Sequence, residues 1–370
     1  MRGFSGSYDP RDVTFLLEPI DLAPIDVETK ERLIQSGARH YSEMIGREDP
    51  PNDAYRAAFD AAFARNRRRY AADLLALADL VDAARSTAPE RVIVSLARAG
   101  TPIGVSLGRV LRRRGRAVAH YSISIIRDRG IDEEALRYIL GRHAPESLVF
   151  VDGWTAKGVI QRELEKSIAR FPIAVSPELF VVADLGGTAA HAATGDDYVL
   201  PSAILNATIS GLVSRSILSD AHHRPGDFHG CLHLTELAPF DRSRAFVDDV
   251  DRDLLETPAR TSAPATDAAT RRTRCLAFIE RVRRDFGVTD ENHIKPGIAE
   301  ATRVMLRRVP ELLMVRDTSD ADVRHLLLLA EERAVEVLVD PELPFTAAAL
   351  IRKLGGGNST SGKASVATAR

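Results

Sequence analysis

Two predicted strand-to-helix turns carry the residues best suited to bind an anion. In the first, the strand 91–96 (RVIVSL) ends in small residues, and a helix begins near Pro102. Backbone amides at such a turn approach a phosphate closely, and the positive end of the helix dipole favours its charge. An ordinary tight turn explains the pattern equally well. The candidate pyrophosphate contacts are Ser95, Ala97, Arg98, Ala99, Gly100 and Thr101.

The second turn follows the strand 147–151 in the sequence SLVFVDGWTAKGVI. A carboxylate at a strand's carboxyl end accepts hydrogen bonds from sugar hydroxyls, while the amides and the hydroxyl that follow hold a phosphate. An aspartate that caps a crossover helix is the alternative. The candidate ribose-phosphate contacts are Asp152, Gly153, Thr155, Ala156, Lys157 and Gly158.

A basic turn lies between these two loops in the sequence YSISIIRDRGID. Arg127 and Arg129 can neutralise charge that develops on a pyrophosphate, although a salt-bridged surface turn is equally consistent with them. Together with Asp152 they are the candidate catalytic residues.

One cysteine stands among histidines in the sequence GDFHGCLH. A nucleophilic thiol needs a base within hydrogen-bond reach, and His229 beside Cys231 offers one. The alternating His, Cys and His are too few for a zinc site, so no metal site is predicted. Most lone cysteines are buried and inert, and a structural role therefore competes with the nucleophile.

Alternating strands and helices position these loops. Strands are predicted at 91–96, 117–126, 147–151 and 179–183, and helices at 102–114, 132–142, 157–170 and 202–219. This alternation predicts a mostly parallel α/β sheet with helices on both faces. Ligands of such sheets bind at the carboxyl ends of the strands, where both anion loops fall.

The rest of the chain divides by composition. Residues 1–90 are mainly helical with a break at Pro50-Pro51, and residues 91–255 form the core of the main domain. Residues 256–270 are rich in Pro, Ala, Thr and Ser and are predicted to be a linker. A small α/β module with strands at 312–316 and 335–339 and a last helix at 346–354 occupies 271–355, and a disordered tail occupies 356–370.

The totals exclude several classes of protein. The chain has 370 residues and a formal net charge of −2, so no global field attracts nucleic acid or anionic lipid. Two cysteines cannot form a disulfide framework in a chain this long. No signal peptide and no apolar run of membrane length is recognised, so a cytoplasmic protein with no membrane partner is expected.

The two anion loops resemble the pyrophosphate loop and the phosphoribosyl-diphosphate (PRPP) signature of type I phosphoribosyltransferases. Asp152 and Gly158 hold the end positions of that signature, but Gly153 stands where its second acid belongs. The resemblance implies a type I phosphoribosyltransferase-like fold, a phosphorylated ribose ligand, and Mg²⁺ that bridges pyrophosphate and ribose. A homodimer is expected by analogy with that fold class.

Longer segments resemble a narrower family. GSYDPRDVTFLL, SLARAGTPIG, FVDGWTAKGVI and PSAILNATISGLVSR are similar to a bacterial family that occurs with tellurite-resistance and stress-response genes, whose members are often named cysteine protease StiP. The resemblance spans about residues 5–249. From this family context we expect an enzyme that makes or breaks a glycosidic bond in the synthesis of a nucleoside-like metabolite for stress response. The alternatives are a cysteine protease that uses Cys231 and His229, and a non-catalytic regulator that binds nucleotide or RNA.

Residues 294–355 resemble the Pelota RNA-binding domain and its α/β/α layout. The resemblance implies RNA as a partner, with Lys295, Gly297 and Glu300 in the loop that meets it. A small interaction or regulatory module is the alternative.

Overall fold

The computed structural model describes residues 3–257 and 266–354. The predicted tail at 356–370 and most of the predicted linker lie outside this range. Six parallel strands form the main sheet in the order β1-β4-β3-β7-β8-β9, which confirms the predicted parallel α/β class. The strands are β1 (Thr14–Leu16), β3 (Arg91–Leu96), β4 (Val118–Ile123), β7 (Leu148–Thr155), β8 (Leu179–Asp184) and β9 (His191–Thr194).

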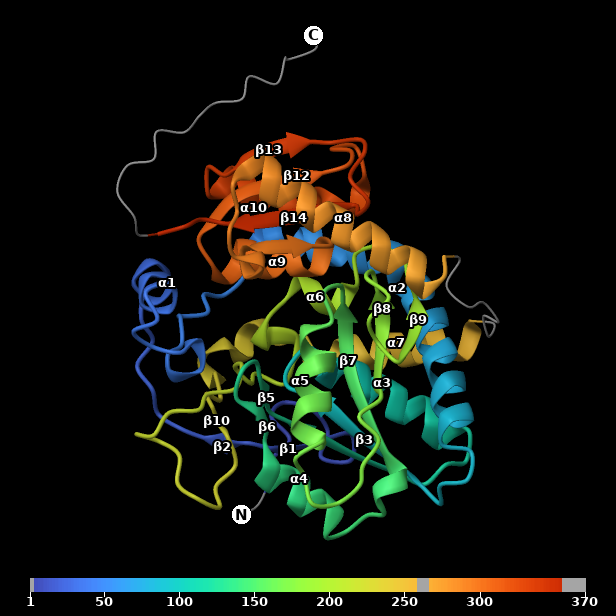
Figure 1. The fold of residues 1–370 in the computed structure, drawn as a ribbon. Coiled ribbons are helices and arrows are strands. Elements are labelled where there is room, and N and C mark those ends of the chain that lie inside the picture. The colour runs from blue at the N-terminus through green and yellow to red at the C-terminus, as the bar shows by residue number, and fades with distance from the viewer. Residues whose placement is uncertain (1–2, 258–265, 355–370) are drawn as a thin grey trace.

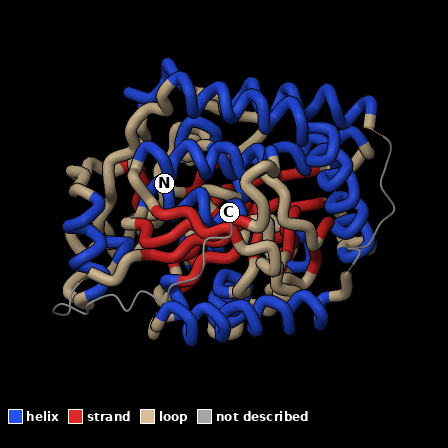
Figure 2. Tube along the Cα trace, turned by 90° about the horizontal axis from the view of Figure 1, so that it is seen from above, coloured by secondary structure: helices blue, strands red, loops and turns tan. Residues whose placement is uncertain are grey.

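Helices cover both faces of this sheet, and the view from above shows the strands between two rows of helices (Figure 2). On one face pack α2 (Asp53–Ala84), α3 (Gly100–Arg113) and α7 (Ser243–Glu256), and on the other α4 (Glu133–Leu140) and α5 (Val159–Ile168). Strand β3 is buried along its whole length because both its faces are covered, and its side chains alternate between the two cores. Ile93 belongs to one core, and Val92 and Val94 belong to the other.

The predicted break at Pro50-Pro51 separates α1 (Val27–Gln35) from α2. Asn52 caps α2 by accepting a hydrogen bond of 2.8 Å from the backbone N–H of Tyr55. The remaining short elements are β2 (Glu18–Pro19), β5 (Ile125–Ile126), β6 (Gly130–Ile131), α6 (Pro201–Ile204), β10 (Gly230–Cys231) and six 3₁₀ turns among the described residues. None of the described helices combines the length and the apolarity that a membrane span requires.

Two predicted helices are wrong. The helix at 202–219 shrinks to α6 and a 3₁₀ turn (Ala207–Ile209), because Asn206 is not helical and Gly211 and Leu212 both have positive φ. The last predicted helix, at 346–354, contains the strand β14 (Ala347–Ile351), which pairs with strands on both sides. A short apolar run such as AAALI fits a buried strand as well as a helix, and the tertiary pairing decides.

The C-terminal module is an α/β/α sandwich, as the resemblance implied. Its strands have the order β11-β14-β12-β13, with α8 on one face and α9 and α10 on the other. Its elements are α8 (Ala268–Phe286), β11 (Ile294–Pro296), α9 (Ile298–Arg307), β12 (Pro310–Val315), α10 (Arg324–Glu332) and β13 (Glu336–Val339). In Figure 1 this orange-to-red module lies over the end of the main sheet toward which the β7 arrow points.

The two parts share one hydrophobic cluster. Residues of α9 and α10, including Ile298 and Leu326, belong to the same buried cluster as Leu74 of α2. Polar contacts join them as well, because Arg65 of α2 forms an ion pair of 2.7 Å with Asp322. The C-terminal module is therefore docked on the main sheet and contributes to its core.

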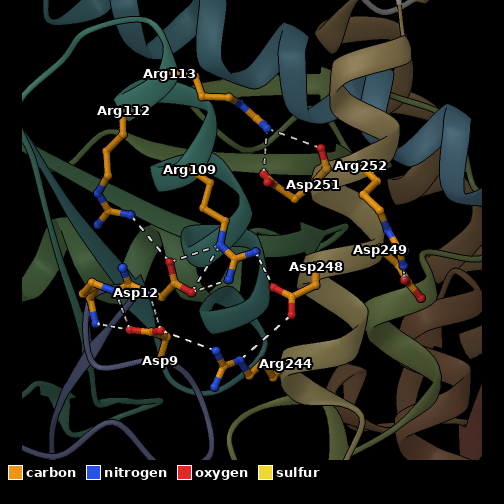
Figure 3. A network of polar contacts seen from close by, with 11 residues as sticks. Asp9, Asp12, Arg109, Arg112, Arg113, Arg244, Asp248, Asp249, Asp251 and Arg252 are labelled. Carbon is orange, nitrogen blue, oxygen red and sulfur yellow. Dashed lines mark hydrogen bonds and ion pairs between the residues drawn. The ribbon is translucent and has the colours of Figure 1, made fainter.

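A polar network fastens the N-terminal segment to α3 and α7 (Figure 3). Asp12, which is buried, accepts a hydrogen bond of 2.5 Å from Arg109 of α3, and Arg112 lies 3.7 Å from its other oxygen. Arg109 continues to Asp248 of α7 at 2.7 Å. Asp12 thus links β1 to two helices that cover one face of the sheet.

We expect the substitution Asp12→Asn to lower the free energy of unfolding by about 2 kcal/mol, because charge-assisted hydrogen bonds to Arg109 are lost where little water replaces them. Urea denaturation followed by circular dichroism measures the change. Asp21→Asn, at an exposed aspartate, is the matched control and should leave stability unchanged. Equal midpoints for the two variants would show that the network contributes no stability.

Candidate functional site

A cavity of about 590 Å³ lies where the carboxyl ends of β3 and β7 face α9 of the C-terminal module. From β3 the chain passes to β4 on one side, whereas β7, β8 and β9 lie on the other side. Ligands of parallel sheets bind at such a reversal of strand order. The main part contributes residues 45–52, 96–99, 125–127, 154–160 and 204–208, and the C-terminal module contributes Lys295, Pro296, Glu300, Arg303, Val304, Leu306, Arg307 and Arg308.

The loop after β3 divides into residues that face the cavity and residues that face the core. Ala97, Arg98 and Ala99 line the cavity. Ser95 and Thr101 do not, and their hydroxyls lie 2.8 Å from buried partners, His120 Nε2 and Ser122 Oγ respectively. At Gly100 an added Cβ would lie 2.3 Å from the carbonyl oxygen of Val151, so glycine permits the close approach of this loop to β7.

Arg98 is held by the structure around it. Its guanidinium forms two hydrogen bonds to Glu48, of 3.1 and 2.5 Å, and a third to the carbonyl of Val213 at 2.9 Å. Glu48 is a cavity residue that the sequence did not single out. Arg98 therefore lines the cavity while its positive charge is neutralised by Glu48.

The loop after β7 places a buried acid at the cavity wall. Asp152 is 8% exposed, and its Oδ1 accepts a hydrogen bond of 2.8 Å from the N–H of Gly153. Burial raises the pKa of Asp152 to about 6, against the opposing effect of Arg303. Trp154 donates from Nε1 to Glu300 at 3.1 Å, which ties this loop to the C-terminal module.

The end of the same loop lines the cavity through Thr155, Ala156, Lys157 and Gly158. Gly158 has a φ of +67° and is the N-cap residue that precedes α5. The ammonium of Lys157 donates to the carbonyl of Glu291 at 2.5 Å, and burial lowers its pKa to about 8. This lysine is therefore bonded to the C-terminal module.

The two arginines of the basic turn have different positions. Arg127 lines the cavity and contacts Asp128 at 3.1 Å and Asn292 at 3.0 Å. Arg129 does not line it, and instead forms an ion pair with Glu43. Of the predicted catalytic residues, the fold thus brings Asp152 and Arg127 to one cavity.

The three residues predicted to meet RNA face the main sheet. Lys295 and Glu300 line the cavity 3.7 Å apart, and Arg303 lies 2.9 Å from Glu300. Burial alone would raise the pKa of Glu300, but Arg303 and Lys295 lower it to about 2. An added Cβ at Gly297 would lie 2.3 Å from Leu185 of the main part. Both predicted sites, for ribose phosphate and for RNA, therefore meet at one cavity.

Sequence reasoning missed several charged residues of this wall. Lys30, Arg215 and Arg307 come from distant segments and carry no local motif. A possible signal was the Arg307-Arg308 pair at the end of an amphipathic helix, but basic residues commonly end helices.

The histidine–cysteine segment lies elsewhere in the molecule. Cys231 is 0% exposed in β10, and burial raises its pKa to about 12. His229 Nδ1 lies 2.7 Å from the hydroxyl of Ser124, and its backbone N–H donates to Asp132 at 2.6 Å. In the described part of the chain no histidine is hydrogen-bonded to the Cys231 thiol. Neither Cys231 nor His229 lines the cavity.

The second thiol lies just behind the β7 loop. Cys275 of α8 is buried, and its Sγ lies 3.8 Å from the carbonyl oxygen of Ala156. Burial raises its pKa to about 11, although Lys157 nearby acts in the opposite direction. Both cysteines are therefore thiols at neutral pH.

Among residues 3–257 and 266–354, no three His, Cys, Asp or Glu side chains lie together in a way that could hold a metal ion. From the sequence, Mg²⁺ is expected only together with a bound pyrophosphate. Asp152 has no second acid beside it with which to hold the ion. This ion stays a prediction, as do the homodimer and the cytoplasmic location.

Comparison with known proteins gives the family. Residues 6–251 match the model of a family described as "Tellurite-like stress resistance cysteine protease StiP", and residues 273–353 match "PELOTA RNA binding domain". This chain belongs to the StiP family. A relative from Acinetobacter baylyi (strain ATCC 33305 / BD413 / ADP1), named "Cysteine protease StiP", is 40% identical over an alignment of length 371 that covers 96% of each chain. No solved structure matches the chain.

These matches overturn the prediction of phosphoribosyl transfer. Both the StiP family and the relative are named for a cysteine protease, and neither name refers to a phosphoribosyltransferase. The structure gives a physical reason for the difference, because Gly153 supplies no second carboxylate and the hydroxyls of Ser95 and Thr101 are bonded within the core. The resemblance was confined to two loops that end parallel strands.

The raised pKa of Asp152 yields a stability prediction for this StiP-family chain. Because the folded-state pKa lies above that of an ordinary aspartate, the folded state loses stability as the pH rises from about 4 to about 6. We expect Asp152→Asn to be more stable than the wild type at pH 7.5, by about 3 kcal/mol, and nearly equal to it at pH 4. Urea denaturation at the two pH values measures both differences.

Asp197 is the matched control, since burial raises its pKa to about 6 as well. Its carboxylate accepts backbone hydrogen bonds from Ile298 at 3.0 Å and Thr346 at 2.8 Å. Asp197→Asn would set an amide NH₂ against a backbone N–H, so this variant should be less stable than the wild type. If Asp152→Asn is less stable than the wild type, the ionised Asp152 carboxylate does not carry the desolvation cost that we assign to it.

Proposed function

We propose that this StiP-family chain is a cysteine protease, an enzyme that cleaves peptide bonds with a thiolate nucleophile. The observation that supports this function is the extent of the similarity to the relative named "Cysteine protease StiP", which covers 96% of both chains. The similarity therefore includes the main part and the C-terminal module together. In such an enzyme Sγ attacks the peptide carbonyl and expels the amine, and water then hydrolyses the acyl-enzyme.

We assign Cys231 as the nucleophile. The sequence has two cysteines, Cys231 and Cys275, and the StiP match over residues 6–251 contains only the first. His229 is two residues away on the same short extended segment, so both side chains can point to one side of it. Burial lowers the pKa of His229, which leaves a neutral imidazole able to accept a proton.

The burial of Cys231 sets a condition on this chemistry. A thiol with a pKa near 12 and no exposed surface neither ionises at neutral pH nor meets a peptide. Catalysis therefore requires β10 to separate from its neighbours, which are β2 on one edge and the segment at Ile217 on the other. Two backbone hydrogen bonds join β2 and β10, from Glu18 to His229 at 2.9 Å and from Ile20 to Cys231 at 2.8 Å. A ladder this short opens at low cost compared with global unfolding.

Replacing each thiol in turn tests the assignment. Cys231→Ala should reduce hydrolysis of a fluorogenic casein by a factor on the order of 10³ or more, because the nucleophile is lost. Cys275→Ala is the matched control and should keep at least half of the wild-type rate. Circular dichroism confirms that both variants are folded.

Activity that survives in Cys231→Ala and disappears in Cys275→Ala would contradict Cys231 as the nucleophile. Activity that survives in both variants would contradict a cysteine protease altogether. Mass spectrometry after brief treatment with iodoacetamide adds an independent measurement, because opening of β10 should make Cys231 react faster at high pH than Cys275, although Cys231 is the less exposed thiol in the closed structure.

We also infer that the C-terminal module binds RNA, on the basis of its match to the Pelota RNA-binding family. Lys295 and Glu300 face the cavity with 18% and 22% of their side-chain surface exposed, so we infer that RNA meets the docked module mainly through another surface. Arg272 and Arg274 are exposed on the outer side of α8, where arginines can contact phosphates.

Fluorescence anisotropy of the full chain with a labelled kinked RNA hairpin tests this surface. The double variant Arg272→Gln/Arg274→Gln should weaken binding about tenfold at low salt and reduce the slope of log K against log salt by about 2. Lys295→Gln, which removes the same kind of charge inside the cavity, should change the affinity less than twofold. The opposite ranking would show that the module binds RNA through the loop at Lys295.

A further inference from the structure

The cavity between the two parts carries an excess of positive charge. Eleven lysines and arginines line it, against five aspartates and glutamates. Some of these cations are neutralised locally, as Arg98 is by Glu48 and Arg303 is by Glu300. The excess therefore resides in cations that have no acidic partner.

Among the cavity cations for which no ion pair is found in the described residues, Lys30, Arg215 and Arg307 form one cluster. Lys30 Nζ donates to the carbonyl of Arg307 at 3.0 Å, and Arg215 donates to the carbonyls of Tyr41, at 2.6 Å, and Met44. Arg307 donates from Nε to the amide oxygen of Asn206 at 2.7 Å. Within the described residues none of the three forms an ion pair, and neutral oxygens hold them in place. Glu48 favours the charged forms of Arg215 and Arg307, and Glu31 that of Lys30, but burial outweighs these acids and the pKa of each cation stays lowered.

Each of these cations also makes the charged form of its neighbours less stable. Burial, followed by Arg215, Arg308 and Arg307, lowers the pKa of Lys30 to about 8. Burial and the neighbouring Arg98 lower the pKa of Arg307 well below its usual value, and burial lowers that of Arg215 to about 10. Like charges in a poorly hydrated space are costly unless a countercharge lies among them. Hydrogen bonds to neutral groups fix the geometry of the cluster but leave that cost.

We propose that this cavity binds a compact polyanion, a small molecule whose clustered anionic oxygens accept hydrogen bonds from Lys30, Arg215 and Arg307. Its volume of about 590 Å³ lies within the range of small-molecule sites. The site is separate from the proposed nucleophile, since Cys231 and His229 are not part of its wall. The proposal goes beyond peptide hydrolysis and does not depend on it.

Calorimetric titration of the full chain with sodium tripolyphosphate, and in parallel with citrate, tests the proposal. The wild type should bind with a dissociation constant that rises steeply with salt. Arg307→Gln should raise that constant at least about tenfold, because one charge-assisted contact is lost. Arg68→Gln, which removes an exposed arginine of α2 outside the cavity, is the matched control and should bind as the wild type does.

Thermal unfolding separates lost binding from lost folding. Without ligand, Arg307→Gln should unfold at the same temperature as the wild type or higher, since a like charge has left the cluster. Tripolyphosphate should raise the unfolding temperature of the wild type and of Arg68→Gln by the same amount, and that of Arg307→Gln by clearly less. If citrate also binds and its binding also depends on Arg307, the site accepts carboxylates as well as phosphates. If only tripolyphosphate binds, the site is selective for a phosphorylated ligand.

Two outcomes would overturn the proposal. One is no heat and no thermal shift for the wild type with either anion at millimolar concentration. The other is an equal response in the wild type and Arg307→Gln, which would place the anion elsewhere on the protein.

Discussion

One half-buried carboxylate fixes the C-terminal module to the main sheet, and the shape of the candidate site depends on it. Asp197, shortly after β9, accepts backbone hydrogen bonds from Ile298 at the start of α9 and from Thr346 just before β14. The neighbouring Gly297 has a φ of +91° and lies against Leu185, where a side chain would not fit. Together these contacts bring α9 over the carboxyl ends of β3 and β7, and the cavity is the space that remains between them.

This docking changes the electrostatic character of residues that a free module would expose to water. Lys295 and Glu300 become part of an enclosed wall, and Arg303 comes to lie with its guanidinium 4.5 Å from the ring centre of Trp154. Water that would screen the charges is largely replaced by protein, so each charge needs a partner. The acids of the wall satisfy some of the cations, and the remaining cations account for the excess of positive charge.

The same loss of water shifts the pKa values of acidic and basic side chains in opposite directions. It raises the pKa of Asp152 to about 6 and that of Cys231 to about 12, because burial penalises the charged form of an acid. It lowers the pKa of Lys157 to about 8 for the same reason. At Glu300 of the cavity wall, Arg303 and Lys295 lie close enough to reverse this penalty, whereas the Cys231 thiol has no cation among the groups that shift its pKa. The difference explains why a charged wall is compatible with the resting fold and a thiolate at β10 is not.

The sequence by itself determined the family, the two-part organisation and the parallel α/β class, because long motifs and apolar runs between polar turns are local properties. The strand 91–96 begins and ends as predicted, and the loops after β3 and β7 reach the cavity. Only the tertiary structure decided that AAALI forms a strand, that Cys231 is enclosed, and that Lys30 meets Arg307 across 277 positions of sequence. Strand pairing, burial and charge neighbours depend on which surfaces pack together, and no local periodicity encodes that choice.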